Sequence, residues 1–331
     1  MNQRLHPAAV LYQGAGKPLP LLPACEHYTG SEKLINKALQ IQAELGPIFD
    51  ITGDCEDGAP AGLEREHAQM IAARIMSADN RHQRLGARIH DVTHPVWREE
   101  LAILVEQAGS RLAYLVLPKA ERADDALEQI TALDDLRRRH GIAREIPVHV
   151  LIETHGALRE AWQIAALPHV ESLDFGLMDF VSAHHGAIPA SAMRSPGQFE
   201  HPLVARAKTE VAAAALGNGV VPTHSVTTEI RDTTVVGADA RRARQEFGFL
   251  RMWSIHPAQI EPIVAAMRPD FAAVAAAAAI LAAAQDAAWG PIQHAGTLHD
   301  RASYRYYWEL LCRARATGMD IPPDAGARFF A

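Results

Sequence analysis

Two acidic residues close consecutive apolar runs of the sequence and could bind one metal ion. Glu153 lies at the end of the run Val148–Thr154, and Asp179 lies at the end of the run Ser172–Phe180. If these runs are neighbouring strands, both carboxylates approach a cation from adjacent sides and leave its other positions to water and substrate oxygens. A small number of oxygen ligands from protein is typical of Mg²⁺. The pair therefore predicts a magnesium site.

Two basic residues belong to other apolar runs, Arg88 within the run Leu85–Val92 and Lys119 at the end of the run Tyr114–Lys119. Arg88 can bind a carboxylate through two parallel hydrogen bonds and keeps its charge in a pocket. Lys119 could form a Schiff base with a carbonyl substrate, or it could be a structural ion pair. The Schiff base is the less favoured option, because a metal ion already accepts the electrons that the reaction releases.

A zinc site is not expected. His184 and His185 are adjacent in the sequence and cannot share one face of a helix or strand, so they do not form a ligand pair. We interpret them as part of a polar loop.

The elements that carry these residues alternate along the chain. Helical patterns, such as Glu32 to Leu45 after Ser31, separate eight short apolar runs. The runs are Leu19–Ala24, Ile48–Asp54, Leu85–Val92, Tyr114–Lys119, Val148–Thr154, Ser172–Phe180, Val220–Val226 and Arg251–Pro257. No hairpin turn signal lies between them, which favours parallel strands and right-handed crossovers.

This alternation predicts an α/β fold, a single (β/α)8 TIM barrel over residues 1–285 with a C-terminal helical extension over 286–331. A doubly wound open sheet is the alternative, but no GxGxxG motif supports its dinucleotide-binding form. Active sites of barrels lie at the C-terminal ends of the strands, where the acidic and basic residues are found. The alanine-rich run Phe271–Ala284 is too short for a membrane span and is expected to be a core helix.

Composition excludes several classes of function. The chain has 331 residues, of which 48% are apolar, so it can bury a large core. Its 32 Lys and Arg against 39 Asp and Glu give a net charge of −7, and no long basic run is present, so nucleic acid is not an expected partner. The three cysteines are widely spaced and form no CxxC motif, which favours a reducing, cytoplasmic location.

Six motifs resemble the citrate lyase beta-subunit family, in the family's order, between about residues 20 and 285. That family belongs to the HpcH/HpaI aldolases and the phosphoenolpyruvate/pyruvate-type barrels. The motifs are Asp54-Cys55-Glu56-Asp57, Arg88-Ile89-His90, Leu117-Pro118-Lys119, Ile152-Glu153-Thr154, Gly176-Leu177-Met178-Asp179, and Ser254 to Ile260 after Gly248-Phe249.

The resemblance implies a Mg²⁺-dependent carbon–carbon lyase. It would cleave a small hydroxy or keto acid, or its CoA thioester, by retro-aldol or retro-Claisen chemistry through an enolate. Glu153 and Asp179 match the metal ligands, and Arg88 matches the arginine that binds the substrate carboxylate.

The remaining roles also come from the resemblance. Glu56 and Asp57 match an acidic pair that orients Arg88 and metal-bound water, and Gly176 and Met178 lie in the motif expected beside the substrate. A base must take the hydroxyl proton, and His90, His155 and a metal-bound hydroxide are the candidates.

Three positions differ from the family pattern. His90 stands where asparagine is usual, Arg251-Met252 replaces Gly-Lys, and His224 replaces the usual acid of strand seven. These differences leave open whether the substrate is CoA-linked. They also leave an alternative, a dependent or non-catalytic subunit that binds an acyl carrier or a partner enzyme.

The tail contains an aromatic group, Tyr304, Tyr306, Tyr307 and Trp308, which suits a docking helix, a lid or a subunit contact. The family resemblance implies a homo-oligomer, a trimer or a hexamer. The lack of a sufficiently long apolar run predicts no membrane partner.

Overall fold

Eight parallel strands form a closed barrel in this computed structural model, which describes residues 5–12 and 18–330. The strands are β1 (Cys25–Thr29), β2 (Phe49–Asp54), β3 (Leu85–Arg88), β4 (Leu115–Leu117), β5 (Val148–Ile152), β6 (Val170–Phe175), β7 (Val221–His224) and β8 (Arg251–Ser254). Strand β1 pairs with both β2 and β8, which closes the sheet. The predicted (β/α)8 barrel is confirmed.

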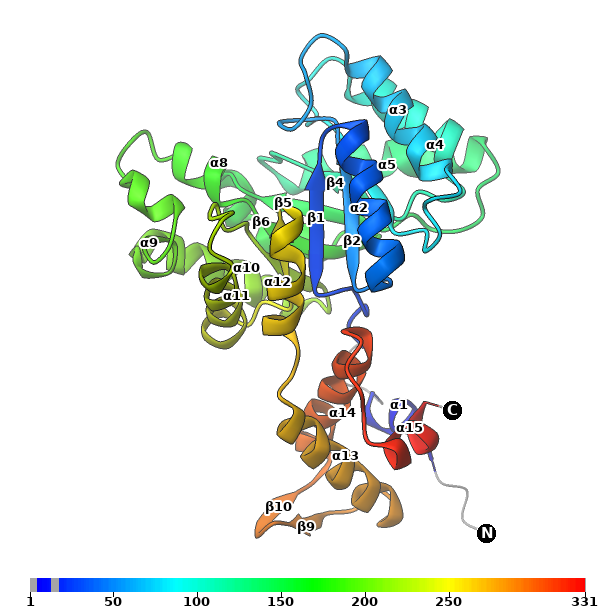
Figure 1. Ribbon diagram of the computed structural model, residues 1–331, viewed down its shortest axis with the longest axis vertical. Helices are drawn as coiled ribbons and strands as arrows, with labels where there is room; N and C mark the ends of the chain where they lie inside the picture. The colour runs from blue at the N-terminus through cyan, green and yellow to red at the C-terminus, as the bar shows by residue number, and fades with distance from the viewer. Residues whose placement is uncertain (1–4, 13–17, 331) are drawn as a thin grey trace. The chain divides into compact units, whose positions relative to one another are not determined.

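Helices surround the barrel (Figure 1). Helix α2 spans the predicted range and is capped by Ser31, whose side chain accepts a hydrogen bond from the Leu34 N–H. The helices of this unit are α2 (Glu32–Leu45), α3 (Glu64–Met76), α4 (Trp97–Ala108), α5 (Ala123–Arg139), α6 (His155–Arg159), α7 (Ala161–Ala165), α8 (Leu177–Ser182), α9 (Gly197–Glu200), α10 (Pro202–Gly217), α11 (Thr233–Phe247) and α12 (Ile260–Met267), with 3₁₀ turns at Ala190–Met193 and Pro257–Gln259.

The prediction of the first strand was wrong. The apolar run Leu19–Ala24 lies just before β1, and the strand itself is the more polar segment from Cys25 to Thr29. All five residues of β1 are buried. Because polar Glu26 and Tyr28 point into the barrel, the strand lacks the apolar character that the sequence analysis looked for.

The sixth predicted run also differs from the structure. It contains a strand that ends at Phe175 and a short helix, α8, that begins at Leu177. Asp179 therefore lies in the first turn of a helix and not on a strand.

The main hydrophobic core lies between the outer faces of the strands and the surrounding helices. In β2, Phe49 and Ile51 belong to this core, while the alternate residues Asp50 and Thr52 face the barrel interior. The same alternation places charged and polar side chains inside the barrel. Their partners are described below.

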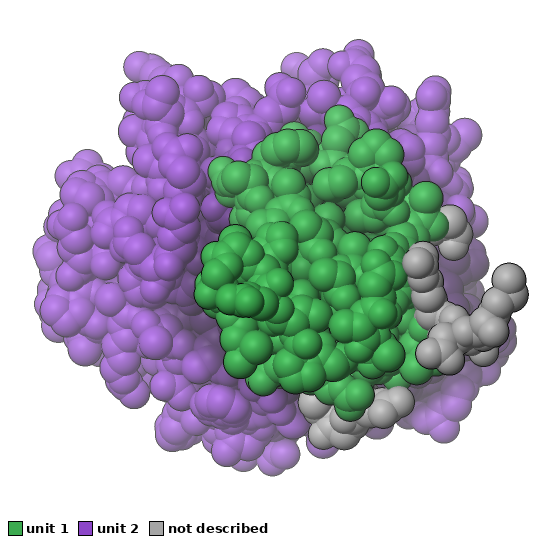
Figure 2. Space-filling view, turned by 90° about the horizontal axis from the view of Figure 1, so that it is seen from below, with its two compact units in different colours: residues 1–22, 268–331 green, residues 23–267 purple. Residues whose placement is uncertain are grey.

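A second compact unit consists of residues 1–22 and 268–331, of which 1–4, 13–17 and 331 lie outside the described residues (Figure 2). Its elements are α1 (Pro7–Leu11), α13 (Phe271–Asp286), α14 (Arg301–Ala316), α15 (Pro323–Phe329) and the hairpin of β9 (Ile292–His294) and β10 (Thr297–His299). Trp289, Tyr304 and Trp308 are buried in its own hydrophobic cluster.

The contacts divide the chain at a different place from the expected boundary at residue 285. The barrel unit covers residues 23–267, and α13 belongs to the second unit because it packs on α14. The alanine-rich segment is the predicted core helix, with buried Val274 and Leu281. The proposed lid or contact role of residues 286–331 stays a prediction.

Within the described residues, no single helix has the length and apolar character needed to cross a membrane. The bent pair Pro257–Met267 and Phe271–Asp286 meets these criteria only when both helices are taken together.

Candidate active site

Arg88 is fixed at the C-terminal end of β3 by carboxylates from the end of β2. Its Nε and Nη2 lie 2.7 and 2.6 Å from the two carboxylate oxygens of Asp54. Glu56 Oε2 lies 2.9 Å from Nη1. Asp54 thus uses two of the five N–H donors of the guanidinium, and the remaining donors on Nη1 and Nη2 can bind a ligand.

Asp54 is built to hold this arginine. Burial alone would raise the pKa of Asp54, but Arg88 and the backbone N–H groups of Glu56 and Gly58 lower it. A side chain on Gly58 would meet the Asp54 carboxylate, because a Cβ there would lie 2.4 Å from Oδ2. The tight turn after β2 therefore needs glycine to close around Asp54.

Two aromatic side chains inside the barrel, Tyr28 and Trp253, pack below Arg88. The guanidinium carbon lies 5.3 Å from the centre of the Tyr28 ring, and that ring lies 4.5 Å from the ring of Trp253. The contact between Arg88 and Tyr28 adds the attraction between a cation and a π system, and the contact between Tyr28 and Trp253 is an aromatic pair.

Lys119 joins the acidic residues of this end of the barrel. Its ammonium group contacts Glu56 and lies 3.0 Å from Asp57 Oδ1 and 3.9 Å from Asp179 Oδ1. Burial alone would lower the pKa of Lys119, but the hydrogen bond and charge of Glu56, with Asp57 and Asp179, raise it. A Schiff base requires a neutral amine, so the ion-pair interpretation of Lys119 is the better one.

Glu153 is a buried acid of this group. It follows β5, is 2% exposed, and accepts a hydrogen bond of 2.9 Å from the backbone N–H of Lys119. Burial and the nearby charge of Asp179 raise the pKa of Glu153 to about 8. A cation between Glu153 and Asp179 would offset both effects, because its positive charge stabilises the ionised carboxylates.

The loop after β6 leaves room for this carboxylate. A Cβ on Gly176 would lie 2.3 Å from Glu153 Oε2, so a larger residue would displace Glu153. Met178 is half-buried against the hydrophobic core, and the Asp179 side chain next to it is 39% exposed.

His90 is held at the rim by a buried acid. Its Nδ1 lies 2.8 Å from Glu100 Oε1, its backbone N–H donates to Glu100 Oε2, and its ring stacks on His94. Burial alone would lower the pKa of His90, but Glu100 raises it. The ring is therefore biased towards its protonated form, which is a poor proton acceptor.

His155 is the other candidate base. It begins α6, two residues after Glu153, and its Nε2 lies 3.2 Å from the carbonyl oxygen of Ala183. A carbonyl accepts but cannot donate, so Nε2 carries the proton and Nδ1 is the basic nitrogen of the neutral ring.

The residues that depart from the family pattern have structural partners in the described part of the chain. Arg251 is fully buried, donates to the carbonyl of Pro23, and pairs with Asp50 and Glu26. His224 is buried against Phe199 and Phe249 on the outer side of β7.

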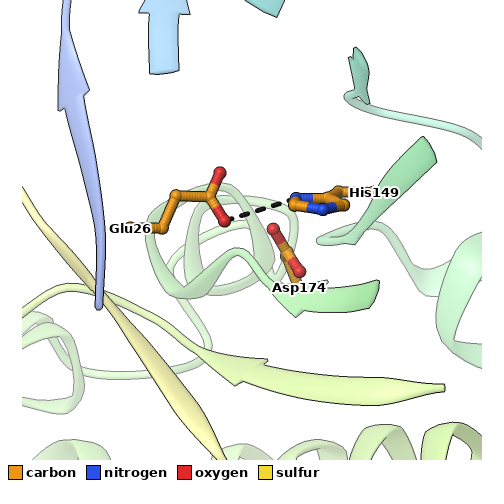
Figure 3. Close-up of side chains that lie close together, drawn as sticks. All are labelled: Glu26, His149 and Asp174. Atoms are coloured by element: carbon orange, nitrogen blue, oxygen red, sulfur yellow. Dashed lines mark ion pairs between the residues drawn. The ribbon is translucent and has the colours of Figure 1, made fainter. Parts of the chain in front are cut away.

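The sequence analysis missed a second group of potential metal ligands inside the barrel: Glu26, His149 and Asp174 (Figure 3). His149 Nδ1 lies 3.3 Å from Glu26 Oε2, the contact drawn dashed in the figure. Burial alone would lower the pKa of His149, but Glu26 and Glu171 raise it to about 10. Asp174 accepts a hydrogen bond from the Trp253 indole. In β1, the alternate residues Glu26 and Tyr28 are polar and face the same side of the strand. This alternation is the signal that could have revealed the group.

A cavity of about 580 Å³ opens among the loops after β6 and β7 and helix α11. Its lining includes Arg194, Arg242 and Glu229, and Asp239, which binds Ser195 and Thr227. The predicted site residues are not among the described residues that line it.

Comparison with known proteins gives a consistent picture. A sequence model of the HpcH/HpaI aldolase/citrate lyase family matches residues 51–257. The chain is 55% identical to a citrate lyase of known structure from Burkholderia xenovorans, with a TM-score of 0.87 over 98% of this chain and all of the other. It is 27% identical to an L-malyl-CoA/beta-methylmalyl-CoA lyase from Cereibacter sphaeroides, over 76% of this chain and 83% of that protein.

The fold is also that of the CitE protein from Mycobacterium tuberculosis. The TM-score is 0.66 at 20% identity, over 90% of this chain and 98% of the other, and that crystal structure contains magnesium, acetoacetate and coenzyme A.

Proposed function

Because the chain belongs to the HpcH/HpaI aldolase/citrate lyase family, we propose that this carbon–carbon lyase uses Mg²⁺ bound by Glu153 and Asp179. The substrate is a small hydroxy or keto acid, free or as its CoA thioester, and the cleavage is a retro-aldol or retro-Claisen reaction.

One observation carries this proposal. Glu153 is buried beside a second carboxylate, and its pKa is raised to about 8 by burial and by Asp179. A pair of oxygen ligands under mutual repulsion fits a hard divalent cation. Perturbed acids of this kind are concentrated at functional sites. When bound, Mg²⁺ supplies a Lewis acid that stabilises negative charge developing on substrate oxygens.

Arg88 binds and orients the substrate carboxylate through its donors on Nη1 and Nη2 that Asp54 does not use. Glu56 and Asp54 keep the guanidinium in place, and the Tyr28 ring packs against the face of the guanidinium and limits its movement. Such an arrangement is formed before the substrate arrives, which lowers the cost of orientation during the reaction. Asp57 acts through Lys119 at the exposed edge of the group.

Proton transfer falls to His155, whose Nδ1 is the free basic nitrogen when Nε2 donates to Ala183. His90 contributes positive charge at the rim, because Glu100 favours its protonated form. Met178 forms part of the substrate wall, and Gly176 keeps Glu153 in position.

The test measures metal binding and cleavage together. Isothermal titration of Mg²⁺, followed by pyruvate, oxaloacetate and acetyl-CoA, compares the wild type with Asp179→Asn and with Glu128→Gln, an exposed acid of α5. We expect Asp179→Asn to lose metal binding and metal-dependent binding of the keto acid, whereas Glu128→Gln should match the wild type. Keto-acid binding that ignores both Mg²⁺ and Asp179→Asn would refute the proposal.

The alternative is a dependent subunit that binds an acyl carrier or a partner enzyme. A panel of hydroxy acids and their CoA thioesters separates the two. Cleavage by the isolated protein that disappears in folded Glu153→Gln supports the lyase, whereas Mg²⁺ binding without cleavage of any panel member favours the alternative.

The proposal places the lyase in the cytoplasm as a homo-oligomer, a trimer or a hexamer, without nucleic-acid or membrane partners. Three free cysteines fit a reducing compartment. In the second unit, Leu298 is 73% exposed and Tyr306 is 64% exposed, which suits a subunit contact. Light scattering after size exclusion should therefore show a higher mass for the wild type than for Leu298→Glu/Tyr306→Glu, and equal monomer masses would contradict the assignment.

A further inference from the structure

Lys119 contacts the proposed metal ligands in two independent ways. The first uses its backbone. Lys119 has a φ of +50°, in the left-handed region that non-glycine residues seldom adopt. This conformation accompanies the hydrogen bond of 2.9 Å from its N–H to Glu153 Oε1. An unfavourable backbone geometry retained beside a proposed active site points to a role there.

The second way uses the side chain. The ammonium contacts Glu56 and lies 3.0 Å from Asp57 and 3.9 Å from Asp179. One residue therefore reaches four carboxylates, which come from the segments after β2 and β5 and from the first turn of α8. The Lys119 side chain is 30% exposed, so it has room to move when a ligand arrives.

The carboxyl groups of this site outnumber its cations. Five acids, Asp54, Glu56, Asp57, Glu153 and Asp179, surround two cations, Arg88 and Lys119. Arg88 is already committed to Asp54 and Glu56. Lys119 is thus the cation in contact with the acids nearest the proposed metal position, among the described residues.

We propose that Lys119 is a positioning residue that sets how tightly Mg²⁺ binds before the substrate does. This inference rests on the proposed function. The amide of Lys119 fixes Glu153, while its ammonium neutralises the surrounding acids and repels a divalent cation placed beside Asp179. An anionic keto acid brings negative charge and offsets this repulsion. Mg²⁺ and the keto acid consequently bind cooperatively, each raising the affinity for the other.

The experiment is an isothermal titration of Mg²⁺ into the full-length protein, with and without saturating pyruvate. In the wild type, pyruvate should tighten Mg²⁺ binding. In Lys119→Met, Mg²⁺ alone should bind about 10-fold more tightly, because a unit charge a few ångströms away is removed, and the effect of pyruvate should shrink. Lys119→Arg keeps the charge and should stay close to the wild type. Lys37→Met, which removes an exposed lysine of α2, is the matched control.

The outcomes separate this inference from the proposed function. If the wild type and Asp179→Asn bind Mg²⁺ equally, the metal site itself is wrong. If Asp179→Asn loses Mg²⁺ but Lys119→Met has unchanged or weaker affinity and an unchanged effect of pyruvate, only the role of Lys119 is refuted. Circular dichroism checks that each variant is folded, and Lys119→Gln replaces Lys119→Met under the same criteria if the latter does not fold.

Discussion

The barrel holds two groups of charged side chains, one inside it and one at the C-terminal ends of its strands. Inside, four acids, Glu26, Asp50, Glu171 and Asp174, meet three cations, Arg84, Arg251 and protonated His149. At the strand ends, five acids meet two cations. Both groups contain residue types that bind metals. The second group has the larger excess of acids over cations, and this difference favours the second group as the site of the proposed metal ion.

The comparison corrects what proximity alone suggests. Glu26, His149 and Asp174 have ligand atoms within 4.8 Å of one another. Yet Arg251 Nη1 lies 3.2 Å from Glu26, and the imidazolium of His149 lies beside the same carboxylate. Arg251 and His149 already supply the charge that a metal ion would bring.

The largest effect is expected when the internal balance is broken. Arg251→Met should reduce the free energy of unfolding by about 3–5 kcal/mol, because the buried carboxylates of Glu26 and Asp50 each lose one of their two cationic partners. Urea unfolding followed by circular dichroism measures it. Arg98→Met, which removes an exposed pair with Glu128, should cost less than about 1 kcal/mol. An equal loss of unfolding free energy in both variants would show that the internal ion pairs stabilise the protein no more than an exposed pair does.

The internal group should also respond to pH. The pKa of His149 is raised to about 10 in the folded protein from an ordinary value of 6.5. Its contribution to stability is complete below pH 6.5 and is lost as pH rises through about 10. The wild type should therefore lose up to about 1.4 kcal/mol of unfolding free energy per pH unit in that window relative to His149→Gln. Parallel pH profiles of the two proteins would contradict this assignment.

A smaller change should disturb the site and spare the interior. Gly176→Ala places a methyl group on Glu153, so Mg²⁺ affinity should fall by about 10–100-fold and stability by about 1–3 kcal/mol. Gly237→Ala, in α11, is a matched control, because a Cβ there would come no closer than 3.5 Å to its neighbours. It should stabilise the protein by about 0.5–1 kcal/mol. Titration calorimetry and urea unfolding give both quantities, and unchanged Mg²⁺ binding in Gly176→Ala would weaken the assignment of Glu153.

The smallest effect is expected at the exposed edge of the site. Asp57 is 55% exposed and shares Lys119 with Glu56. Asp57→Asn should change the unfolding free energy by less than about 1 kcal/mol. A loss as large as that of Arg251→Met would show that exposure does not separate the two groups.

The barrel and the charged group at the C-terminal ends of its strands could be predicted from the sequence, because strand ends converge in this fold. Arg88 ends β3, and Glu153 and Glu56 lie one and two residues after β5 and β2. The structure brings these three residues together. The internal group was not readable in the same way. Polar residues in β1, such as Glu26, hid the apolar pattern that usually identifies a buried strand. The pairing of Glu26 with Arg251 also depends on the contact between β1 and β8 that closes the barrel. Local patterns cannot reveal a partner so far along the chain.

The contacts that Arg251 makes with the first strands have a consequence for folding during synthesis on the ribosome. Arg251 lies 228 residues after Pro23 and 201 after Asp50, the two groups to which it donates hydrogen bonds. Until the eighth strand leaves the exit tunnel, the acids of the first two strands have no Arg251 to neutralise them. Nascent chains that stop short of β8 would carry these acids unpaired and should remain open to proteases. The interior of the barrel can therefore reach its final set of ion pairs only after β8 has been synthesised.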